Sequence, residues 1–555
     1  MRLSAPLLAL FAVSSFALAQ PQTTPQARLP FSPAKVVAAK SSSRSVISSL
    51  AKAEAPDLIA AAAPVREWVS AFNNTTADSN DVAFEMVLDA NGNVYVTGYS
   101  FNVAGNTDIF TIKYNNTGVR QWSARYNGPA KGGDLGHALA VDGLGNVYIA
   151  GTSANALGND DAVTLKYNSA GVLQWASRYD GLGDDGAFDL QLDHLGNVYV
   201  GGHTQVDTTN YDLLTIKYDA AGAQQWLASY HGVGSDSAAI NEVALDAAQN
   251  VYVAGFTNGP TGNLDFATIK YNSAGVEQWV AFYNAAADSV DCANAIAVDA
   301  NGNVYVAGAS TNANGNSDYA TVKYDSLGAR LWVARYNAQA NGMDEALDLA
   351  VDALGNVYVT GGSFGSGGLL DFATLKYNDA GVKQWVARYN AGANGDDVAQ
   401  RLLLDLAGNV YVAGYSMSVS AGFDYALVGY DTDGTQQWVV RHNGTGNSTD
   451  IAFDLAIDRQ RNLYVTGAIT NTNGNFDFST HKYSTLPQLS CATSAKLFTV
   501  EAQGAAGTQV YRYDVRPSGA PVLDLTLTHP SFDQPYGLAF SADKEMFISN
   551  RSAGG

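Results

Sequence analysis

Six ionisable side chains occupy one position of a repeated segment whose neighbouring residues hardly change. The position lies ten residues before a recurring tyrosine, on a segment expected to form a β-strand. It holds Glu85, Asp189, Glu242, Asp348, Arg401 and Asp454, with Ala138 and Ala295 in two further repeats. Carboxylates gathered on one surface can bind a cation or a polar ligand, or act as general acid and base. If these strands line a common channel, we expect all six side chains to face it.

Two interpretations of this row stay open. A solvated channel in which Arg401 pairs with Asp348 or Asp454 of a neighbouring repeat explains the charges without a ligand. The alternative is a binding site for a cation or a small polar ligand within the channel.

A second row of carboxylates precedes the third expected strand of each repeat. Such residues commonly accept hydrogen bonds from turn amides and nearby hydroxyls, such as Thr321 after Asp318. Carboxylate, amide and main-chain oxygens also suit Ca²⁺ in an exported protein, although these loops lack the acidic spacing of a known calcium loop. The calcium candidates are Asp108, Asp265, Asp318 and Asp477.

Other signals of chemistry are weak. Gly361 to Gly365 matches a nucleophile-elbow pattern around Ser363, but no helix is expected after it, so we interpret the match as coincidence. The seven histidines have no zinc-type spacing. Cys292 and Cys491 are expected to lie far apart, which disfavours a disulfide. No motif therefore predicts a catalytic residue.

Internal repeats position these residues. All eight tryptophans recur at gaps of 51 to 54 residues, and the tyrosine of the Asn-Val-Tyr-Val segments keeps the same period from Tyr95 to Tyr464. A period near 53 approaches that of four-stranded propeller blades and is too long for leucine-rich or ankyrin units. One repeat shows strand signals at 293–299, 303–308, 318–325 and 329–337, separated by Gly, Asn and Asp clusters. We expect the aromatic residues to pack between blades.

The ends of the repeat region predict how the ring closes. Seven complete blades run from about 81 to 443, and an eighth has only three strands. The segment 66–73 resembles the outer strand 383–390 but has no blade of its own. We therefore predict an all-β fold, an eight-bladed propeller over residues 66–483 whose last blade is closed by the N-terminal strand.

The flanking segments differ in composition. Residues 1–19 contain an apolar run and an Ala-Leu-Ala cleavage pattern typical of a secretory signal peptide. Residues 20–64 are rich in Pro, Ala, Ser and Thr and are expected to form a disordered linker. Residues 484–555 are expected to form an incomplete second β domain or a docked tail.

Charge excludes some classes of partner. With 52 Asp and Glu against 31 Lys and Arg, the chain has a formal net charge of −21. This balance argues against the basic face that nucleic acid or anionic lipid would require, and no stretch reaches the roughly 18 apolar residues of a membrane-spanning helix. Cations, sugars and basic partners remain compatible with it.

The repeat unit resembles the bacterial SBBP-type β-propeller repeat. The resemblance rests on Asp299–Gly308, Asp318, Lys323-Tyr324 and the segment from Gly328 to Trp332, and it extends over all eight repeats. That family is usually described as seven-bladed and is largely without assigned activity, so the resemblance implies the fold and little about function. Residues 496–551 are weakly similar to a blade of the NHL or lactonase-like kind.

These observations predict an exported, non-enzymatic propeller that acts as a binding or scaffold module at the cell surface or outside the cell. The expected partner is a protein, a carbohydrate or a small polar ligand, with Ca²⁺ as the one cofactor considered. The alternative is a hydrolase or lyase that uses the channel carboxylates as general acid and base. In a third possibility, the ring is purely structural and a truncated second domain carried the activity.

Overall fold

The computed structural model describes residues 63–74, 79–233, 237–338, 341–392, 395–418 and 422–485, together with four strands between 498 and 549. The expected signal peptide, and the expected linker up to residue 62, lie outside the described residues, as does Cys491. The chain divides into two compact units, 1–487 and 488–555. None of the described residues belongs to a helix long and apolar enough to cross a bilayer.

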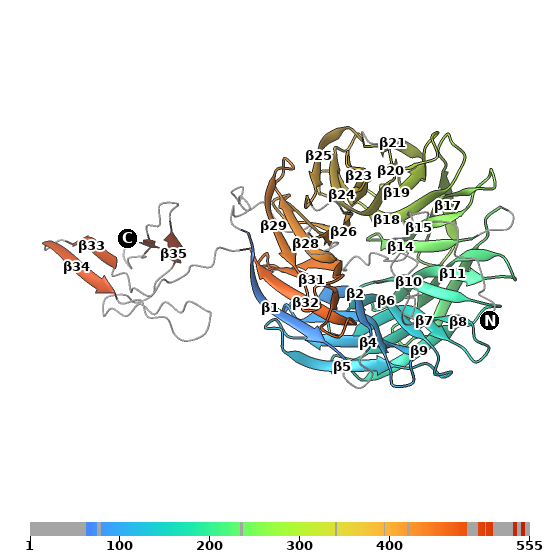
Figure 1. Cartoon of the computed structure of the whole chain (residues 1–555), viewed down its shortest axis with the longest axis horizontal. Coiled ribbons are helices and arrows are strands. Elements are labelled where there is room, and N and C mark those ends of the chain that lie inside the picture. The colour runs from blue at the N-terminus through green and yellow to red at the C-terminus, as the bar shows by residue number, and fades with distance from the viewer. Residues whose placement is uncertain are drawn as a thin grey trace, which may run out of the picture. The chain divides into compact units, whose positions relative to one another are not determined.

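The first unit contains eight four-stranded antiparallel sheets arranged as the blades of a propeller (Figure 1). We number the blades in chain order. Blade 1 contains β2 (Asp81–Leu88), β3 (Val94–Phe101), β4 (Thr107–Tyr114) and β5 (Arg120–Tyr126); blade 2 contains β6 (Asp134–Val141), β7 (Val147–Ala154), β8 (Asp160–Tyr167) and β9 (Leu173–Tyr179); blade 3 contains β10 (Asp185–Leu192), β11 (Val198–Gln205), β12 (Tyr211–Tyr218) and β13 (Gln224–Tyr230); blade 4 contains β14 (Ala239–Leu245), β15 (Val251–Asn258), β16 (Leu264–Tyr271) and β17 (Glu277–Tyr283).

The second half of the ring repeats this order. Blade 5 contains β18 (Asp291–Val298), β19 (Val304–Thr311), β20 (Ser317–Tyr324) and β21 (Arg330–Tyr336); blade 6 contains β22 (Asp344–Val351), β23 (Val357–Phe364), β24 (Leu370–Tyr377) and β25 (Lys383–Tyr389); blade 7 contains β26 (Asp397–Leu404), β27 (Val410–Met417), β28 (Phe423–Tyr430) and β29 (Gln436–His442); blade 8 contains β30 (Ile451–Ile457), β31 (Leu463–Thr470), β32 (Phe476–Ser484) and β1 (Val65–Phe72).

The N-terminal strand closes blade 8, as the sequence predicted. Strand β1 pairs antiparallel with β32, with Val69 opposite His481 and Phe72 opposite Phe478. The first strand of each blade lies against the first strands of its neighbours, including β2 against β30 across the closure. The predicted eight blades are therefore confirmed, and closure leaves the last blade without the open edge that three strands would have.

The first turn of each blade is fixed by its own aspartate. In blade 5, Asp299 accepts hydrogen bonds from the backbone amides of Asn301 (2.8 Å) and Asn303 (2.9 Å), while Gly302 adopts a φ of 79°. The Tyr305 hydroxyl donates to the same carboxylate over 3.1 Å. The turn signal in the sequence is thus explained by local hydrogen bonding and needs no ligand.

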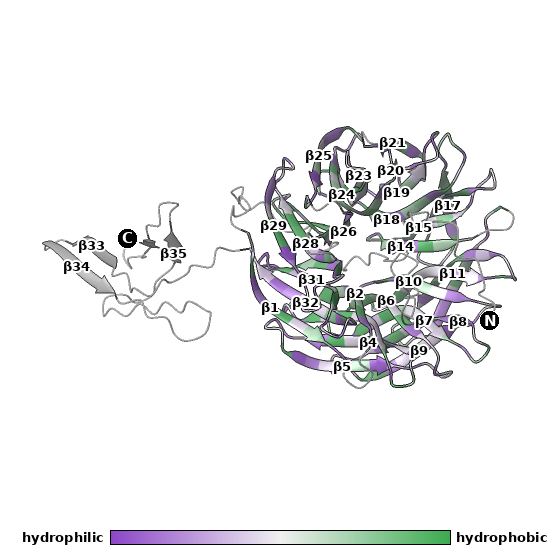
Figure 2. Ribbon diagram, viewed as in Figure 1, coloured by the Kyte–Doolittle hydropathy of each residue, from purple (hydrophilic) through white to green (hydrophobic). Residues whose placement is uncertain are grey.

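The aromatic rows join adjacent blades. Trp332 on the outer strand of blade 5 donates its indole N–H to the carbonyl of Asp379 in blade 6 over 2.9 Å, and its ring covers Gly381. Tyr305 and its equivalents are completely buried, as expected for core residues, whereas the tryptophans other than Trp438 are half-buried. Hydrophobic segments run along the strands in Figure 2, and many of the connecting loops are hydrophilic. Packing of the aromatic residues between blades is confirmed, although most tryptophans lie at the outer edge of the interface between blades and not at its centre.

The second unit contains two antiparallel hairpins among its described residues. Strand β33 (Phe498–Gly504) pairs with β34 (Gly507–Tyr513), and β35 (Gly537–Phe540) pairs with β36 (Met546–Ser549).

Candidate functional site

The ionisable row predicted from the sequence lies on the innermost strands and binds neighbouring blades together. Glu85 in blade 1 accepts a hydrogen bond from the backbone amide of Leu139 in blade 2 over 2.8 Å, and Asp454 in blade 8 accepts one from Met86 in blade 1 over 2.8 Å. The same contact recurs between Asp189 and Val243 (2.6 Å), between Glu242 and Ile296 (2.6 Å), and between Asp348 and Leu402 (2.8 Å). These carboxylates therefore act as inter-blade hydrogen-bond acceptors.

A β-bulge explains why these side chains meet the next blade. In blade 1, Ala83 and Glu85 pair with consecutive residues of β3, so Phe84 is an extra residue, and the other first strands shift at the same place. The inserted residue reverses the in-and-out alternation of the strand. Glu85 is fully buried, and the whole row of ionisable residues is between 0 and 4 % exposed. The expectation that these groups present charge to an open channel therefore differs from the observed burial.

The one basic member pairs within the row. Arg401 lies with its Nε 3.4 Å from Asp454 Oδ1, which is one of the two pairings predicted for it. Burial raises the pKa of Asp454 to about 6 although Arg401 opposes the shift. Burial, followed by the negative charges of Asp454 and Asp189, holds the pKa of Glu85 well above its usual range. Burial thus disfavours the charged form of both Glu85 and Asp454.

Two of the three blades that lack a carboxylate at this position show which hydrogen bond the carboxylates provide. Blade 5 has Ala295 at this position, and the amide of Leu349 in blade 6 donates instead to Asp348 Oδ1 of its own strand over 2.8 Å. Blade 7 has Arg401, and the amide of Leu455 likewise donates to Asp454 Oδ1 over 2.8 Å. A buried amide needs an acceptor, so this hydrogen-bond demand is a structural reason for the row.

The bulge residues form a second ring that the sequence analysis missed. In four consecutive blades they are Phe453, Phe84, His137 and Phe188. Phe84 contacts Phe453 and His137 with ring centroids 5.7 and 6.0 Å apart, and His137 contacts Phe188 at 5.4 Å. Because each contact joins the first strands of adjacent blades, these rings form one aromatic arc around the propeller axis.

Most of the remaining arc carries amides. Its bulge residues are Asn241, Asn294, Leu347 and Gln400. Asn241 Nδ2 donates to the carbonyl of Ala293 in the next blade over 2.7 Å, and Asn294 Nδ2 donates to that of Ala346 over 2.8 Å. We call the two arcs together the axial ring. The sequence signal that could have revealed the axial ring is the variation between repeats at the residue just before the ionisable row.

The loop aspartates of most blades are held by internal donors. Asp318 accepts from Arg335 over 2.9 Å and from Asn312 over 2.6 Å. Asp108 is paired in the same way with Arg125 (2.9 Å) and Asn102 (2.7 Å), and Asp477 accepts from Asn471 over 2.7 Å. Of the four calcium candidates, Asp265 alone has no such donor among the described residues. The metal prediction itself stays untested for all four.

Ser363 belongs to a related network. Its hydroxyl donates to Asp344 and accepts from Arg388 NH1 over 2.7 Å, and the serine is fully buried. Equivalent contacts join Ser416, Asp397 and Arg441 in blade 7. Ser363 thus takes part in a repeated structural interaction, in agreement with its interpretation as a coincidental match.

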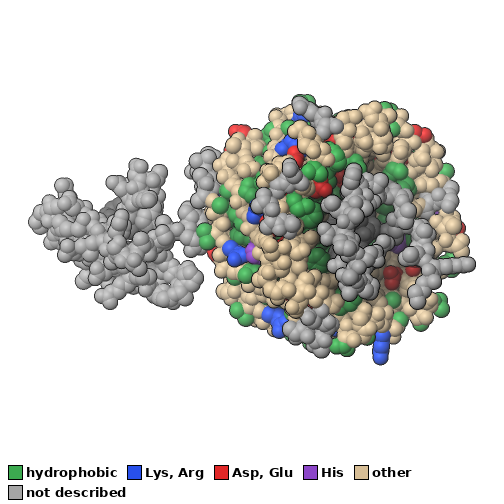
Figure 3. Space-filling view, viewed as in Figure 1, with side chains coloured by type: hydrophobic (Ala, Val, Ile, Leu, Met, Phe, Trp, Pro, Cys, Tyr) green, Lys and Arg blue, Asp and Glu red, His purple; other side chains and the backbone are tan. Residues whose placement is uncertain are grey.

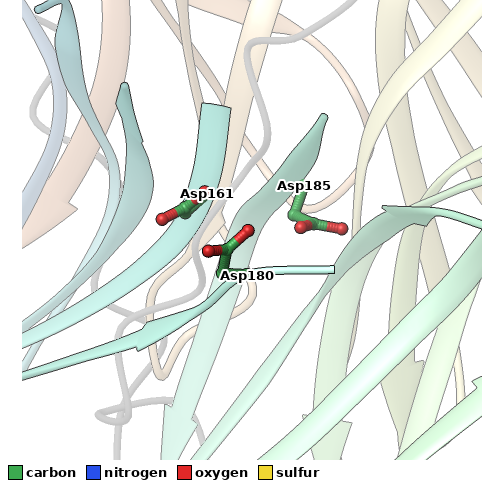
Figure 4. A group of neighbouring side chains, drawn as sticks. All are labelled: Asp161, Asp180 and Asp185. Carbon is green, nitrogen blue, oxygen red and sulfur yellow. The ribbon is translucent and has the colours of Figure 1, made fainter. Parts of the chain in front are cut away.

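One group of carboxylates converges at the junction of blades 2 and 3. Asp161 on β8, Asp180 after β9 and Asp185 at the start of β10 place one oxygen each within 4.8 Å of one another (Figure 4). Arg178 already lies 2.7 Å from Asp161 in this group. Elsewhere on the face seen in Figure 3, acidic and basic side chains of the described part are scattered.

Comparisons with known proteins agree with the architecture. Residues 121–158 match the family model described as SBBP, beta-propeller repeat, so the chain contains this repeat. It is 23 % identical over 378 residues to an uncharacterized WD repeat-containing protein of Acanthamoeba polyphaga mimivirus, covering 55 % of this chain and 26 % of that one. The chain thus spans about a quarter of that relative's length.

Solved structures give low-identity matches. The crystal structure of a eukaryotic initiation factor matches with a TM-score of 0.40 at 11 % identity, over 73 % of this chain and 85 % of that one. A polysaccharide lyase, the ulvan lyase of family PL25, matches with a TM-score of 0.37 at 11 % identity, over 67 % and 95 %.

Proposed function

We propose that this chain, which carries the SBBP-type β-propeller repeat, is an exported, non-enzymatic binding module whose ligand contacts the axial ring. The observation that carries this proposal is the division of the ring into aromatic and amide arcs. His137 contacts both Phe84 and Phe188 on one side, whereas Asn241 and Asn294 lie on the other. Phe84, His137 and Asn294 are the partly exposed members of this set. Packing of near-identical blades alone would not require this asymmetry.

The chemistry of the ring defines the ligand class. Aromatic rings bind apolar faces, and amides both donate and accept hydrogen bonds. Convergent polar groups beside an apolar surface are typical of small-ligand sites. A ligand with one apolar face and several hydroxyl or amide groups, such as a carbohydrate, fits both arcs.

Matched variants test the ring. Phe84→Leu changes the aromatic arc, Asn294→Ala changes the amide arc, and Leu157→Ala removes a loop side chain that is 85 % exposed. Binding of the full chain to a panel of immobilised oligosaccharides should weaken at least tenfold in both ring variants and stay unchanged in the loop variant. Equal binding by all three proteins would contradict the proposal, as would the absence of binding to every oligosaccharide.

A carboxylate-dependent hydrolase or lyase is the second candidate. The raised pKa of Asp454, about 6, and the elevated pKa of Glu85 favour it, because a general acid must hold a proton near neutral pH. Against it, both carboxylates are buried and bonded to backbone amides of the next blade. Glu85→Gln separates the two: an enzyme would lose turnover of a bound oligosaccharide, whereas a binding module has no turnover to lose.

Export is the third element of the proposal and rests on the sequence of residues 1–19. Protein recovered from the periplasm or the medium should begin at Gln20 on N-terminal sequencing. A product retained in the cytosol with Met1 intact would contradict export and would leave the ring proposal standing.

A further inference from the structure

Blade 4 lacks the arginine that pairs with the loop aspartate in most blades. In five blades an arginine of the outer strand lies within 3.0 Å of the third-strand aspartate, as Arg335 does with Asp318. In blade 4 the arginine position is Phe282. The asparagine that donates to the carboxylate in blade 5, Asn312, is replaced by Gly259. Asp265 has therefore lost both of its usual donors.

Asp265 is completely buried, and neither of its oxygens has a hydrogen-bond partner among the described residues. Blade 3 also lacks the arginine, but there Ser229 and His231 contact Asp212 at 2.5 and 2.7 Å. An uncompensated buried carboxylate is costly, so a positive charge or a proton is needed beside it.

A second oxygen without a donor belongs to Asn284. It follows Asp265 by 19 positions, the spacing at which Asn390 contacts Asp371 in blade 6. In blade 4 the Asn284 amide nitrogen instead donates to Thr261 (2.9 Å) and Asp288 (2.8 Å). Its oxygen is buried and accepts no hydrogen bond within the described structure.

The third member is Asp291, which begins β18 in blade 5. Its two oxygens accept from the amides of Ala285 and Thr311, each over 2.9 Å, and the side chain is buried. The negative charges of Asp291 and Asp288 add to burial in raising the pKa of Asp265 to about 7.

The blade 2–3 junction shows that these three positions converge. Asp161, Asp180 and Asp185 are the counterparts of Asp265, Asn284 and Asp291, and their oxygens lie within 4.8 Å of one another (Figure 4). That junction contains the internal cation Arg178, whereas the blade 4–5 junction has Phe282 in the corresponding place. The blade 4–5 junction thus has the ligand positions without a guanidinium paired to Asp265, whereas Arg335 of blade 5 acts electrostatically on Asp291.

We propose that the junction of blades 4 and 5 binds one hard cation of the Ca²⁺ class between Asp265, Asn284 and Asp291. The set offers carboxylate and amide oxygens only, which are the ligands that Ca²⁺ prefers, and Ca²⁺ tolerates irregular coordination better than Mg²⁺ does. The ion supplies the positive charge that arginine supplies in five other blades.

Calorimetric titration of the full chain with CaCl₂, after removal of metals with EDTA, tests the proposal. Wild type should bind one ion per chain and melt at a higher temperature in millimolar Ca²⁺ than in EDTA. Phe282→Arg restores the internal cation, so it should weaken Ca²⁺ binding at least tenfold and raise the melting temperature in EDTA. Asp265→Asn, which nearly preserves side-chain shape, should also abolish binding.

Asp318→Asn is the matched control, because it removes the equivalent carboxylate from a blade that has its own arginine. It should leave the Ca²⁺ affinity within twofold of wild type. The proposal is overturned if wild type shows no binding in millimolar Ca²⁺. It is also overturned if Asp265→Asn retains the wild-type affinity, which would place the ion elsewhere, for example at Asp161.

Discussion

Replacement of Gly328 by alanine tests the contact between each tryptophan and the next blade. Gly328 has a φ of 85°, and a β-carbon added there would lie 2.7 Å from Trp279 Cδ2. The left-handed backbone costs alanine about 1–2 kcal/mol, and overpacking against the indole adds about 1–3 kcal/mol. We therefore expect Gly328→Ala to lower the free energy of unfolding by about 2–5 kcal/mol.

Gly315 is a control within the same blade. Its φ is 82°, but an added β-carbon would meet no atom within 4 Å. Gly315→Ala should therefore cost only the backbone component, about 1–2 kcal/mol. The difference between the two variants isolates the contact with Trp279.

A double-mutant cycle completes the test. In a Trp279→Ala background the obstacle is removed, so Gly328→Ala should then cost as much as Gly315→Ala does. Urea unfolding of the full chain, followed by circular dichroism with equal m-values in all variants, measures these differences. If Gly328→Ala and Gly315→Ala cost the same in the wild-type background, the inferred packing of indole on glycine is wrong.

Three further predictions concern the histidines His442 and His481, whose rings lie 4.4 Å apart between blades 7 and 8, the tryptophan row, and the loop aspartates. Burial and the charge of Arg66 lower the pKa of His442 to about 4, and burial holds the pKa of His481 well below its usual value. As the pH falls below 6.5, these histidines therefore take up protons in the unfolded chain before they do in the folded chain. The free energy of unfolding should consequently fall between pH 6.5 and 4. Melting curves should show a smaller loss over that range for a His442→Tyr, His481→Val double variant than for wild type; an identical loss would contradict the assignment. Trp332→Ala should lower the free energy of unfolding by about 3 kcal/mol, the lower end of the range for aromatic truncation, because the side chain is half-buried; an unchanged melting temperature would refute its packing role. Asp318→Asn removes the ion pair with a partly exposed arginine and should cost about 1–3 kcal/mol in urea unfolding, whereas no change would mean that the pair contributes nothing.

The fold could be predicted because its signals are local and repeated. One tryptophan in each repeat gave the number of blades, and the unpaired segment at 66–73 gave the closure that β1 forms with β32. Each turn contains the aspartate, and most contain the glycine, that its geometry needs, as Asp299 and Gly302 illustrate. These features depend on a few neighbouring residues, so they can be recognised in a sequence.

The orientation of the ionisable row could not be predicted in the same way. Strict alternation along the first strand turns Glu85 toward the axis, but the inserted Phe84 reverses the alternation at that point. A bulge leaves no single residue type as its mark, since Phe84, Asn294 and Leu347 all occupy it. The position adjacent to the predicted row was therefore the one that forms the axial ring.

Comparison among the blades shows which donors the fold provides to the third-strand carboxylate and where they are missing. The third-strand carboxylate forms an ion pair with arginine in five blades, hydrogen-bonds to Ser229 and His231 in blade 3, and accepts from an asparagine in blade 8. If stability alone governed blade 4, an asparagine at position 265 would remove a buried charge at almost no change in volume. The chain instead keeps Asp265 and omits its donors. Either a proton or a cation from outside the chain could compensate this carboxylate, and the cation also provides a partner for the buried Asn284 oxygen that lacks a donor among the described residues.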